Sequence, residues 1–147
     1  MNNRLQRLLL LLLIGAWVLP VLMVSGCARY DKREMVVTAY SSDAISTNWR
    51  RGTIFFWKTY VASGPHKGQP KKVGVTASGT KATKGTIAAD TRYYPYGTVM
   101  KIPGYGTGVV EDIGSAIKGP NRIDLYFSTR KRALQWGRQR LIVKIKR

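Results

Sequence analysis

From Lys72 to the end of the chain, short runs rich in β-branched residues alternate with glycines. Runs of this length and composition, bounded by turn residues, are typical of β-strands. Many short strands with frequent turns predict a small β-barrel or β-sandwich. The runs are VGVTASG, GTIAAD, GTVMKIPGYG, TGVVEDIG, RIDLYFS and RLIVKIK.

One segment in this half, STRKRALQWG, has a helical pattern. Ser128 or Thr129 can cap its start, and Gly137 suits its C-terminal end. Ala133 and Leu134 are expected to face inward. A single helix before the last strand fits a barrel with one strand-to-strand crossover, so the expected fold class is mainly β with one short helix.

Ahead of Lys72, residues 35–40 and 53–62 are rich in β-branched and aromatic residues and predict two strands. Residues 41–52 have no sustained period and are expected to form a loop. Residues 30–34 are charged and are expected to be part of a short tether before the domain. His66, the only histidine, lies among turn-forming residues, which favours a solvated loop position over a catalytic base.

The N-terminus has the layout of a secretory signal, with Arg4 and Arg7 ahead of an apolar run over residues 8–24. The run is nearly long enough to span a bilayer, so an uncleaved anchor is the alternative. The motif VSGC favours cleavage because it resembles a lipobox, whose cysteine is acylated and becomes the first mature residue. Val24 stands where leucine is usual in that motif.

Cys27 is the only cysteine, so an internal disulfide is excluded, and lipid attachment explains its position better than a free thiol does. One cysteine and one histidine cannot supply a structural zinc site. We predict a signal peptide over residues 1–26, a tether over 27–34 and one domain over 35–147. Because Ala28 follows the cysteine, we expect an outer-membrane lipoprotein facing the periplasm in a diderm cell, and a cell-surface protein otherwise.

The chain is strongly basic, with 25 Lys and Arg against 7 Asp and Glu and a formal charge of +18. Such a charge favours polyanionic partners. An exported protein meets cell-wall carboxylates, wall polymers and anionic lipids, so we expect no nucleic-acid partner. Simple solubility is the competing explanation.

Three of the seven acids, Glu111, Asp112 and Asp124, lie in one glycine-rich stretch. Asp90, Asp112 and Asp124 each follow an apolar run, and strand ends can converge at the mouth of a closed barrel. We therefore expect these three carboxylates to meet there. Glu111 should point to the opposite face, towards solvent, because side chains alternate along a strand.

Clustered carboxylates favour one protonated member, because a nearby like charge raises the pKa of a carboxyl group. A protonated carboxyl can act as a general acid on a glycosidic oxygen. The composition alone leaves a structural role, bonding backbone amides at a turn, equally open for each aspartate. Lys118 and Arg122 can position anionic substrate groups. Four glycines can allow close approach of a ligand, namely Gly106, Gly108, Gly114 and Gly119. Five aromatic residues can stack on sugars or pack at the rim, namely Tyr93, Tyr94, Tyr96, Tyr105 and Tyr126.

The second half of the chain resembles the 3D domain, a family named for three aspartates. The resemblance is carried by the pattern GTIAAD…YPYGTVMKIPGYGTGVVEDIGSAIKGPNRIDLYF…ALQWG…IVKI. It is similar to the catalytic part of membrane-bound lytic transglycosylase A and to stationary-phase muralytic proteins. The resemblance extends to VTAY and TASG and covers most of residues 37–145. Residues 41–75 lie outside the shared pattern and look like an insertion.

The resemblance implies a six-stranded double-psi β-barrel with its three aspartates at Asp90, Asp112 and Asp124. The implied catalytic acid is Asp112, which would cleave the bond between N-acetylmuramic acid and N-acetylglucosamine and form a 1,6-anhydro product without a cofactor. The family's DTGG is DIGS here, so Ile113 and Ser115 depart from the pattern.

The implied partners are peptidoglycan glycan strands, with Lys118, Arg122, Tyr96, Gly114 and Gly119 as substrate-binding residues and a membrane reached through lipid on Cys27. A monomer is expected. A hydrolase that uses two carboxylates and water is a close chemical variant. Two rival functions stay open, namely a non-catalytic wall-binding module and a divalent-metal site built from the three aspartates.

Overall fold

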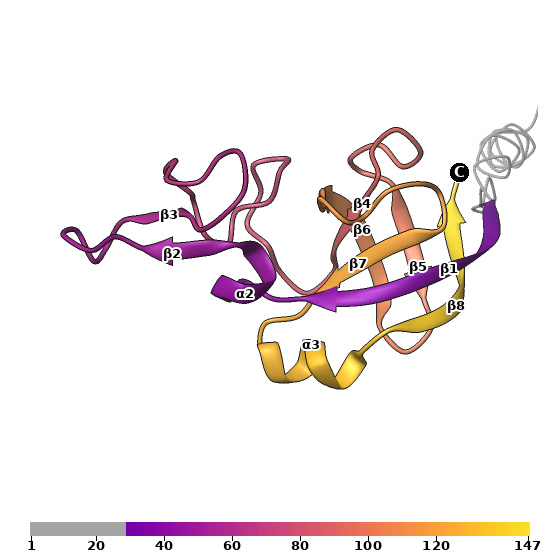
Figure 1. The fold of residues 1–147 in the computed structure, drawn as a ribbon. Coiled ribbons are helices and arrows are strands. Elements are labelled where there is room, and N and C mark those ends of the chain that lie inside the picture. Colours follow the sequence, from indigo (N-terminus) through magenta and orange to yellow (C-terminus); the bar gives the residue numbers. More distant parts are fainter. Residues whose placement is uncertain (1–28) are drawn as a thin grey trace, which may run out of the picture.

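The computed structural model describes residues 29–147, and the predicted signal peptide and Cys27 lie outside the described residues. Six strands form a closed barrel in the order β1-β7-β4-β6-β5-β8 (Figure 1). Strands β1 and β7 pair in parallel, as do β4 and β6, while the other neighbours are antiparallel. The predicted fold class, an all-β six-stranded double-psi barrel, is confirmed. The strands are β1 Tyr30–Tyr40, β4 Thr86–Ala89, β5 Val99–Ile102, β6 Gly106–Asp112, β7 Arg122–Tyr126 and β8 Gln139–Lys146.

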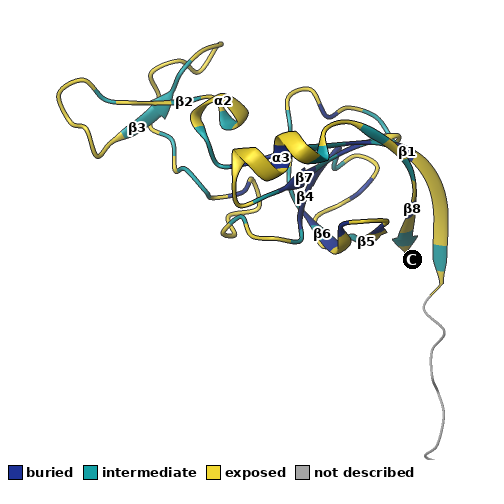
Figure 2. Ribbon diagram, turned by 90° about the horizontal axis from the view of Figure 1, so that it is seen from below, coloured by how far each residue is buried: buried dark blue, intermediate teal, exposed yellow. Residues whose placement is uncertain are grey.

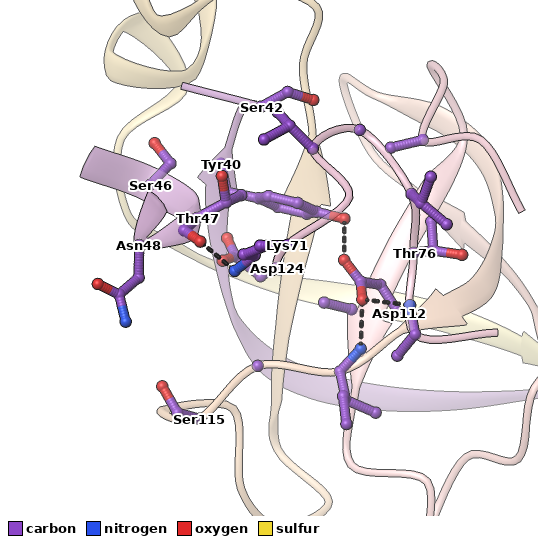
Figure 3. Close-up of a pocket in the computed structure, with 18 of the residues that line it drawn as sticks. Tyr40, Ser42, Ser46, Thr47, Asn48, Lys71, Thr76, Asp112, Ser115 and Asp124 are labelled. Carbon is purple, nitrogen blue, oxygen red and sulfur yellow. Dashed lines mark hydrogen bonds between the residues drawn. The ribbon is translucent and has the colours of Figure 1, made fainter. Parts of the chain in front are cut away.

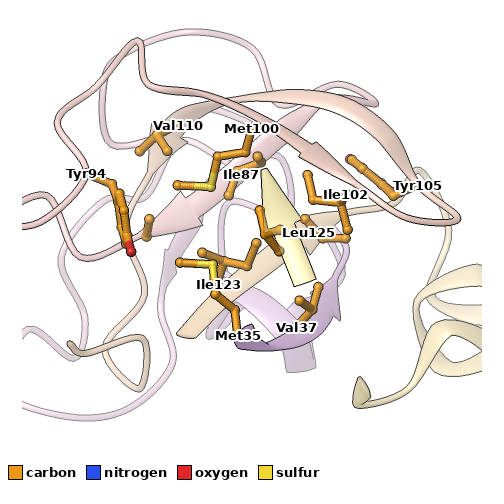
Figure 4. Packing of buried hydrophobic residues seen from close by; sticks show 12 residues of the cluster. Met35, Val37, Ile87, Tyr94, Met100, Ile102, Tyr105, Val110, Ile123 and Leu125 are labelled. Atoms are coloured by element: carbon orange, nitrogen blue, oxygen red, sulfur yellow. The ribbon is translucent and has the colours of Figure 1, made fainter. Parts of the chain in front are cut away.

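The barrel interior is filled by alternate residues of the strands, because successive side chains of a strand point to opposite faces (Figure 4). Val37 on β1, Ile87 on β4 and Leu125 on β7 are fully buried there. The remaining buried members of this core are Met35, Ala89, Tyr94, Met100, Ile102, Tyr105, Val110, Ile123 and Val143. A separate small cluster of Tyr40, Ala88 and Tyr126 lies on the outer side of the same strands.

Strand β1 begins earlier than the sequence predicted. Residues 30–34, expected to be part of a tether, pair antiparallel with β8, with Tyr30 opposite Lys146 and Glu34 opposite Ile142. Residues 31–34 are all exposed, so both faces of this part of the strand are in water, where charged side chains are stable. Arg147 also bonds Asp31, with Nε 2.6 Å from Oδ2.

Residues 41–75, here called the arm, leave the barrel after β1 and project from its side (Figure 1). The arm contains helix α2 Ala44–Thr47 and a two-stranded sheet of β2 Trp49–Arg51 and β3 Thr59–Val61. Figure 2 shows that its surface is mostly intermediate or exposed, whereas buried segments are concentrated in the barrel.

The strand predicted over residues 53–62 is wrong for its first half. Only Thr59–Val61 is a strand, and residues 54–57 form an exposed apolar tip between β2 and β3. Ile54 is 80% exposed and Trp57 is 74% exposed, because no sheet or helix within residues 29–147 covers this end of the arm. The predicted run VGVTASG contributes only an isolated bridge between Val75 and Lys81.

Helix α3 Arg130–Trp136 confirms the predicted helix before the last strand. The Thr129 side chain accepts a hydrogen bond from the Arg132 amide, and Gly137 ends the helix. Ala133 is buried as expected, but Leu134 is 64% exposed, so its predicted inward position is wrong. The one-turn helix α2 is a second helix that the sequence did not predict. Within residues 29–147, no helix combines the length and hydropathy that crossing a membrane requires.

Candidate functional site

Two of the three predicted aspartates lie on one row across the barrel wall. In the sheet, Thr38 on β1 is opposite Asp124 on β7, Asp124 is opposite Ala88 on β4, and Ala88 is opposite Asp112 on β6. Ala88 belongs to the outer cluster, while its neighbour Ile87 belongs to the barrel core. The row therefore lies on the outer face of the barrel, and the expected position in the barrel mouth is wrong.

A register shift in β6 brings Asp112 to this face. Ile87 pairs with Val110, but the next residue, Ala88, pairs with Asp112. Glu111 is thus an extra residue in β6, as in a β-bulge. Its Oε2 accepts a 2.7 Å hydrogen bond from Thr86 Oγ1, so Glu111 is tied to the barrel wall rather than simply directed to solvent.

The Asp112 carboxylate accepts three hydrogen bonds (Figure 3). Tyr40 Oη donates to Oδ2 at 2.8 Å, while the amides of Ala77 and Ile113 donate to Oδ1 at 3.0 and 2.9 Å. Burial, and then the Asp112 charge, raise the pKa of Tyr40 well above its usual range, so Tyr40 remains a neutral donor at physiological pH. Three donors from separate segments fix the position of this carboxyl group.

Asp124 lies beside Asp112 in a different environment. Thr38 Oγ1 donates a 2.8 Å hydrogen bond to Asp124 Oδ1. Burial raises the pKa of Asp124, the nearby Asp112 charge adds to this, and Thr38 and Arg122 oppose it. The site therefore pairs a firmly held carboxyl with a neighbour that retains a proton more readily than an ordinary aspartate.

Asp90 does not share this site. Its carboxylate accepts from Arg92 Nη2 at 2.7 Å and Nε at 2.9 Å, and from the Gly119 amide at 2.8 Å. These bonds, chiefly those from the Arg92 side chain, hold the pKa of Asp90 far below its usual range. The expected convergence of three carboxylates is therefore wrong for Asp90, which fastens the loop containing Gly119 instead.

Asp112 and Asp124 line a groove of about 680 Å³ between the barrel and the arm. One wall is the outer face of the barrel with the loop after β6, and the other wall is the arm (Figure 3). The arm contributes Ser42, Ser46, Thr47, Asn48, Pro70, Lys71, Lys72, Val73, Gly74 and Val75. The insertion predicted from the sequence thus forms one wall of the candidate site.

The predicted substrate-binding residues divide between the groove and other places. Gly114 lines the groove, together with Ile113 and Ser115, the two departures from the family pattern. The other predicted positions, Lys118, Arg122, Tyr96 and Gly119, are not among the lining residues. Arg122 bonds the Ala116 carbonyl from Nη1 at 3.1 Å, and Lys118 and Tyr96 are exposed.

Sequence reasoning missed Tyr40 and Ala77 as partners of Asp112, and Thr38 as the partner of Asp124. A signal was present for all three, since the VTAY and TASG blocks belong to the resemblance. Lys71 and Lys72 had no such signal, because they lie in the insertion. Among residues 29–147, no three His, Cys, Asp or Glu side chains gather closely enough to hold a metal ion.

Residues 85–146 match the 3D domain. The resemblance predicted from the sequence is confirmed over that segment, which begins just before β4 and includes Asp90, Asp112 and Asp124. It does not include β1 or the arm. Tyr40 and the arm wall of the groove therefore lie outside the matched domain.

Two proteins of Bacillus subtilis (strain 168) are similar to this chain. The putative cell wall shaping protein YabE is 41% identical over 59 residues, which is 40% of this chain and 14% of YabE. The cell wall-binding protein YocH is 37% identical over 76 residues, which is 49% of this chain and 26% of YocH. This chain thus matches about a quarter or less of these relatives. Two crystal structures of MltA from Escherichia coli are 22% and 20% identical, with TM-scores of 0.42 and 0.43, over 54% of this chain and 29% of MltA.

Proposed function

We propose that this protein acts on the bacterial cell wall as a peptidoglycan lytic transglycosylase. The observation that carries the proposal is the Asp112 carboxyl, held by three donors on the barrel wall of an open groove, beside Asp124, whose pKa is raised by burial. The match to the 3D domain and the likeness to proteins named for wall shaping and wall binding support the choice of polymer.

In the proposed reaction, Asp112 gives a proton to the oxygen that links N-acetylmuramic acid to N-acetylglucosamine. The bond between that oxygen and the anomeric carbon breaks, and an oxocarbenium-like state forms. The C6 hydroxyl of the same muramic acid residue then bonds the anomeric carbon, and its proton passes to Asp112. No water is consumed, and the acid is regenerated.

Asp124 and Tyr40 have supporting roles in this proposal. Next to Asp112, Asp124 releases a proton less readily than an ordinary aspartate, because burial raises its pKa. Tyr40 and the Ala77 amide keep the Asp112 carboxyl pointed into the groove. Asp90 is assigned to holding the Gly119 loop rather than to chemistry.

The test is digestion of purified peptidoglycan sacculi, with mass analysis of the soluble products. The parent should release anhydro-sugar ends, and Asp112→Asn should lower the rate by about 10²–10⁴-fold, the usual contribution of general acid catalysis. Asp31→Asn is the matched control, because Asp31 is an exposed acid on β1 outside the groove. An Asp112→Asn protein as fast as the parent would exclude the assigned role.

A non-catalytic wall-binding module is the second candidate. It is favoured by the same three hydrogen bonds, which would also suit a purely structural carboxylate, and by the likeness to a wall-binding protein. Release of neither anhydro ends nor reducing ends by the folded parent, together with retained sacculus binding, would select this candidate. Reducing ends without anhydro ends would indicate the hydrolase variant.

We also propose that the protein is an exported lipoprotein anchored through Cys27. The start of β1 and the arm lie at opposite ends of the molecule (Figure 1), so an anchor ahead of β1 would leave the groove on the side away from the membrane. Labelled fatty acid should be incorporated by the parent and not by Cys27→Ser. Equal labelling of the two proteins would reject the anchor.

A further inference from the structure

The arm and the loops that follow it contain no acid beyond Asp43. Between Asp43 and Asp90 the chain has no Asp or Glu, although it carries eight basic residues. The excess of positive charge is therefore a local feature of residues 44–89. The basic residues are Arg50, Arg51, Lys58, Lys67, Lys71, Lys72, Lys81 and Lys84.

Two of these residues, Lys71 and Lys72, line the groove itself. The Lys71 backbone is fixed to β3, since its amide donates to the Thr59 carbonyl at 2.8 Å. Its ammonium group donates to the Thr47 carbonyl at the end of α2, as Figure 3 shows. An ammonium group has three donors, so the bond to Thr47 leaves others for a ligand.

The groove therefore has acidic residues on one wall and basic residues on the other. Asp112 and Asp124 lie on the barrel wall, and Lys71 and Lys72 lie on the arm wall. An anionic group placed over the aspartates would gain no attraction from them, whether or not they hold protons, whereas the same group placed against the lysines would meet an opposite charge. A ligand that fits both walls has an uncharged part over the aspartates and an anionic substituent on one side.

We propose that Lys71 and Lys72 bind a carboxylate of the peptide attached to the glycan, while the uncharged sugars lie over Asp112. This inference rests on the proposed function and specifies the substrate further. It assigns the recognition of anionic groups to the arm, in place of Lys118 and Arg122, which are not part of the groove lining.

The test measures binding of soluble peptidoglycan fragments to the full chain carrying Asp112→Asn, so that turnover does not interfere. Fragments with free peptide carboxylates are compared with the same fragments after amidation. Lys71→Gln with Lys72→Gln should weaken binding of the free-carboxylate fragments by about 10-fold, since close charge pairs at a binding surface carry energies of this order. Binding of the amidated fragments should not change.

The matched control is Lys58→Gln with Lys67→Gln, which removes the same charge from exposed arm positions that do not line the groove. An equal loss of binding in this control, or an equal loss with amidated fragments, would overturn the inference in favour of bulk electrostatics. If the double variant misfolds, Lys72→Gln alone replaces it in the test, because Lys72 is exposed. Unchanged binding of the free-carboxylate fragments by a folded variant would also overturn the inference.

A second experiment distinguishes binding to carboxylates from binding to phosphates. Sacculi are compared before and after phosphodiester wall polymers are stripped. Lysine-dependent binding that survives stripping supports the peptide carboxylate, and binding lost on stripping overturns it. Failure of the proposed function can be told apart from either result. If the parent binds fragments in the predicted way but cleaves no glycan, only the proposed cleavage is refuted.

Discussion

Tyr40 Oη lies 2.8 Å from Asp112 Oδ2, although the two residues are 72 positions apart in sequence. The bond joins the end of β1 to the end of β6 across the outer face of the barrel. Tyr40 lies outside the segment that matches the 3D domain, while Asp112 lies within it. The candidate acid is therefore held in place by a strand that the family match does not include.

Tyr40→Phe should lower glycan cleavage by about 10- to 100-fold, because small displacements of a reacting group can cost that much. The phenylalanine ring keeps the edge contact with Tyr126, at a centroid distance of 5.5 Å, so the fold should persist. Steady-state rates on soluble glycan should show the loss mainly in kcat. Tyr93→Phe, an exposed tyrosine, is the control. Equal rates for Tyr40→Phe and the parent would show that the hydrogen bond does not position Asp112.

Asp124→Asn should change how stability depends on pH. Burial raises the folded-state pKa of Asp124, so the folded protein binds more protons than the unfolded chain above pH ~4, the ordinary aspartate value. The stability contributed by the protonated group is present below that pH and is lost as pH rises through the raised pKa. Asparagine does not ionise, and its Oδ1 can still accept from Thr38.

The variant should therefore gain stability relative to the parent as pH rises from about 4 to 7, the range that begins at the ordinary aspartate pKa. Urea unfolding of both proteins at several pH values gives this difference directly. Parallel stability curves for parent and variant would contradict the burial effect assigned to Asp124.

Asp90→Asn should have the opposite pH dependence. The Arg92 side chain, followed by the Gly119 amide, lowers the folded-state pKa of Asp90, so its contribution is present above pH ~4 and is lost as pH falls. The variant should be less stable than the parent at pH 7, and the gap should narrow in acid. Thermal unfolding at pH 7 and pH 3 tests this, and a constant gap would show that the ion pair does not carry the effect.

Gly108→Ala should destabilise the barrel by about 1–3 kcal/mol, the usual cost of overpacking a filled core. An added Cβ would lie 2.6 Å from the Gly85 carbonyl oxygen and 2.8 Å from two carbons of Ile87, and the backbone contact cannot rotate away. Urea unfolding measures the loss. Thr107→Ala, at the exposed neighbouring position, should stay within about 0.5 kcal/mol of the parent.

Ile54→Ser and Phe56→Ser at the tip of the arm should each change stability by less than about 0.5 kcal/mol, because both side chains are largely exposed. Ile123→Ala in the barrel core should cost about 2–5 kcal/mol in the same assay. A large loss from the tip variants would mean that the tip packs against another part of the protein in solution.

Strands β4 to β7 were predictable because each contains a short apolar run between turns, whereas the charged first half of β1 was not. Helix α3 was predictable because the sequence supplies both a capping residue, Thr129, and a terminal glycine, Gly137. The position of Asp112 was not predictable from alternation. One extra residue, Glu111, breaks the two-residue period of β6, and nothing in the letters VVED indicates which residue is extra.

The arm was not predictable for a different reason. Residues 54–57 have a strand-like composition. Such a composition shows that the residues would suit a half-buried sheet surface, but it does not show whether a partner strand is available to pair with them. The role of Lys71 depends on where the arm folds back relative to Asp112, which is a long-range contact. Asp90 was misjudged because Arg92, two residues away, pairs with it locally.

The arm contributes no side chain to either buried cluster of the barrel. The groove thus combines a wall built on the barrel core with a wall that adds no side chain to that core. Substrate preference can consequently change in evolution, or be redesigned, through replacement of the segment between Ser42 and Val75, while the barrel that holds Asp112 stays the same.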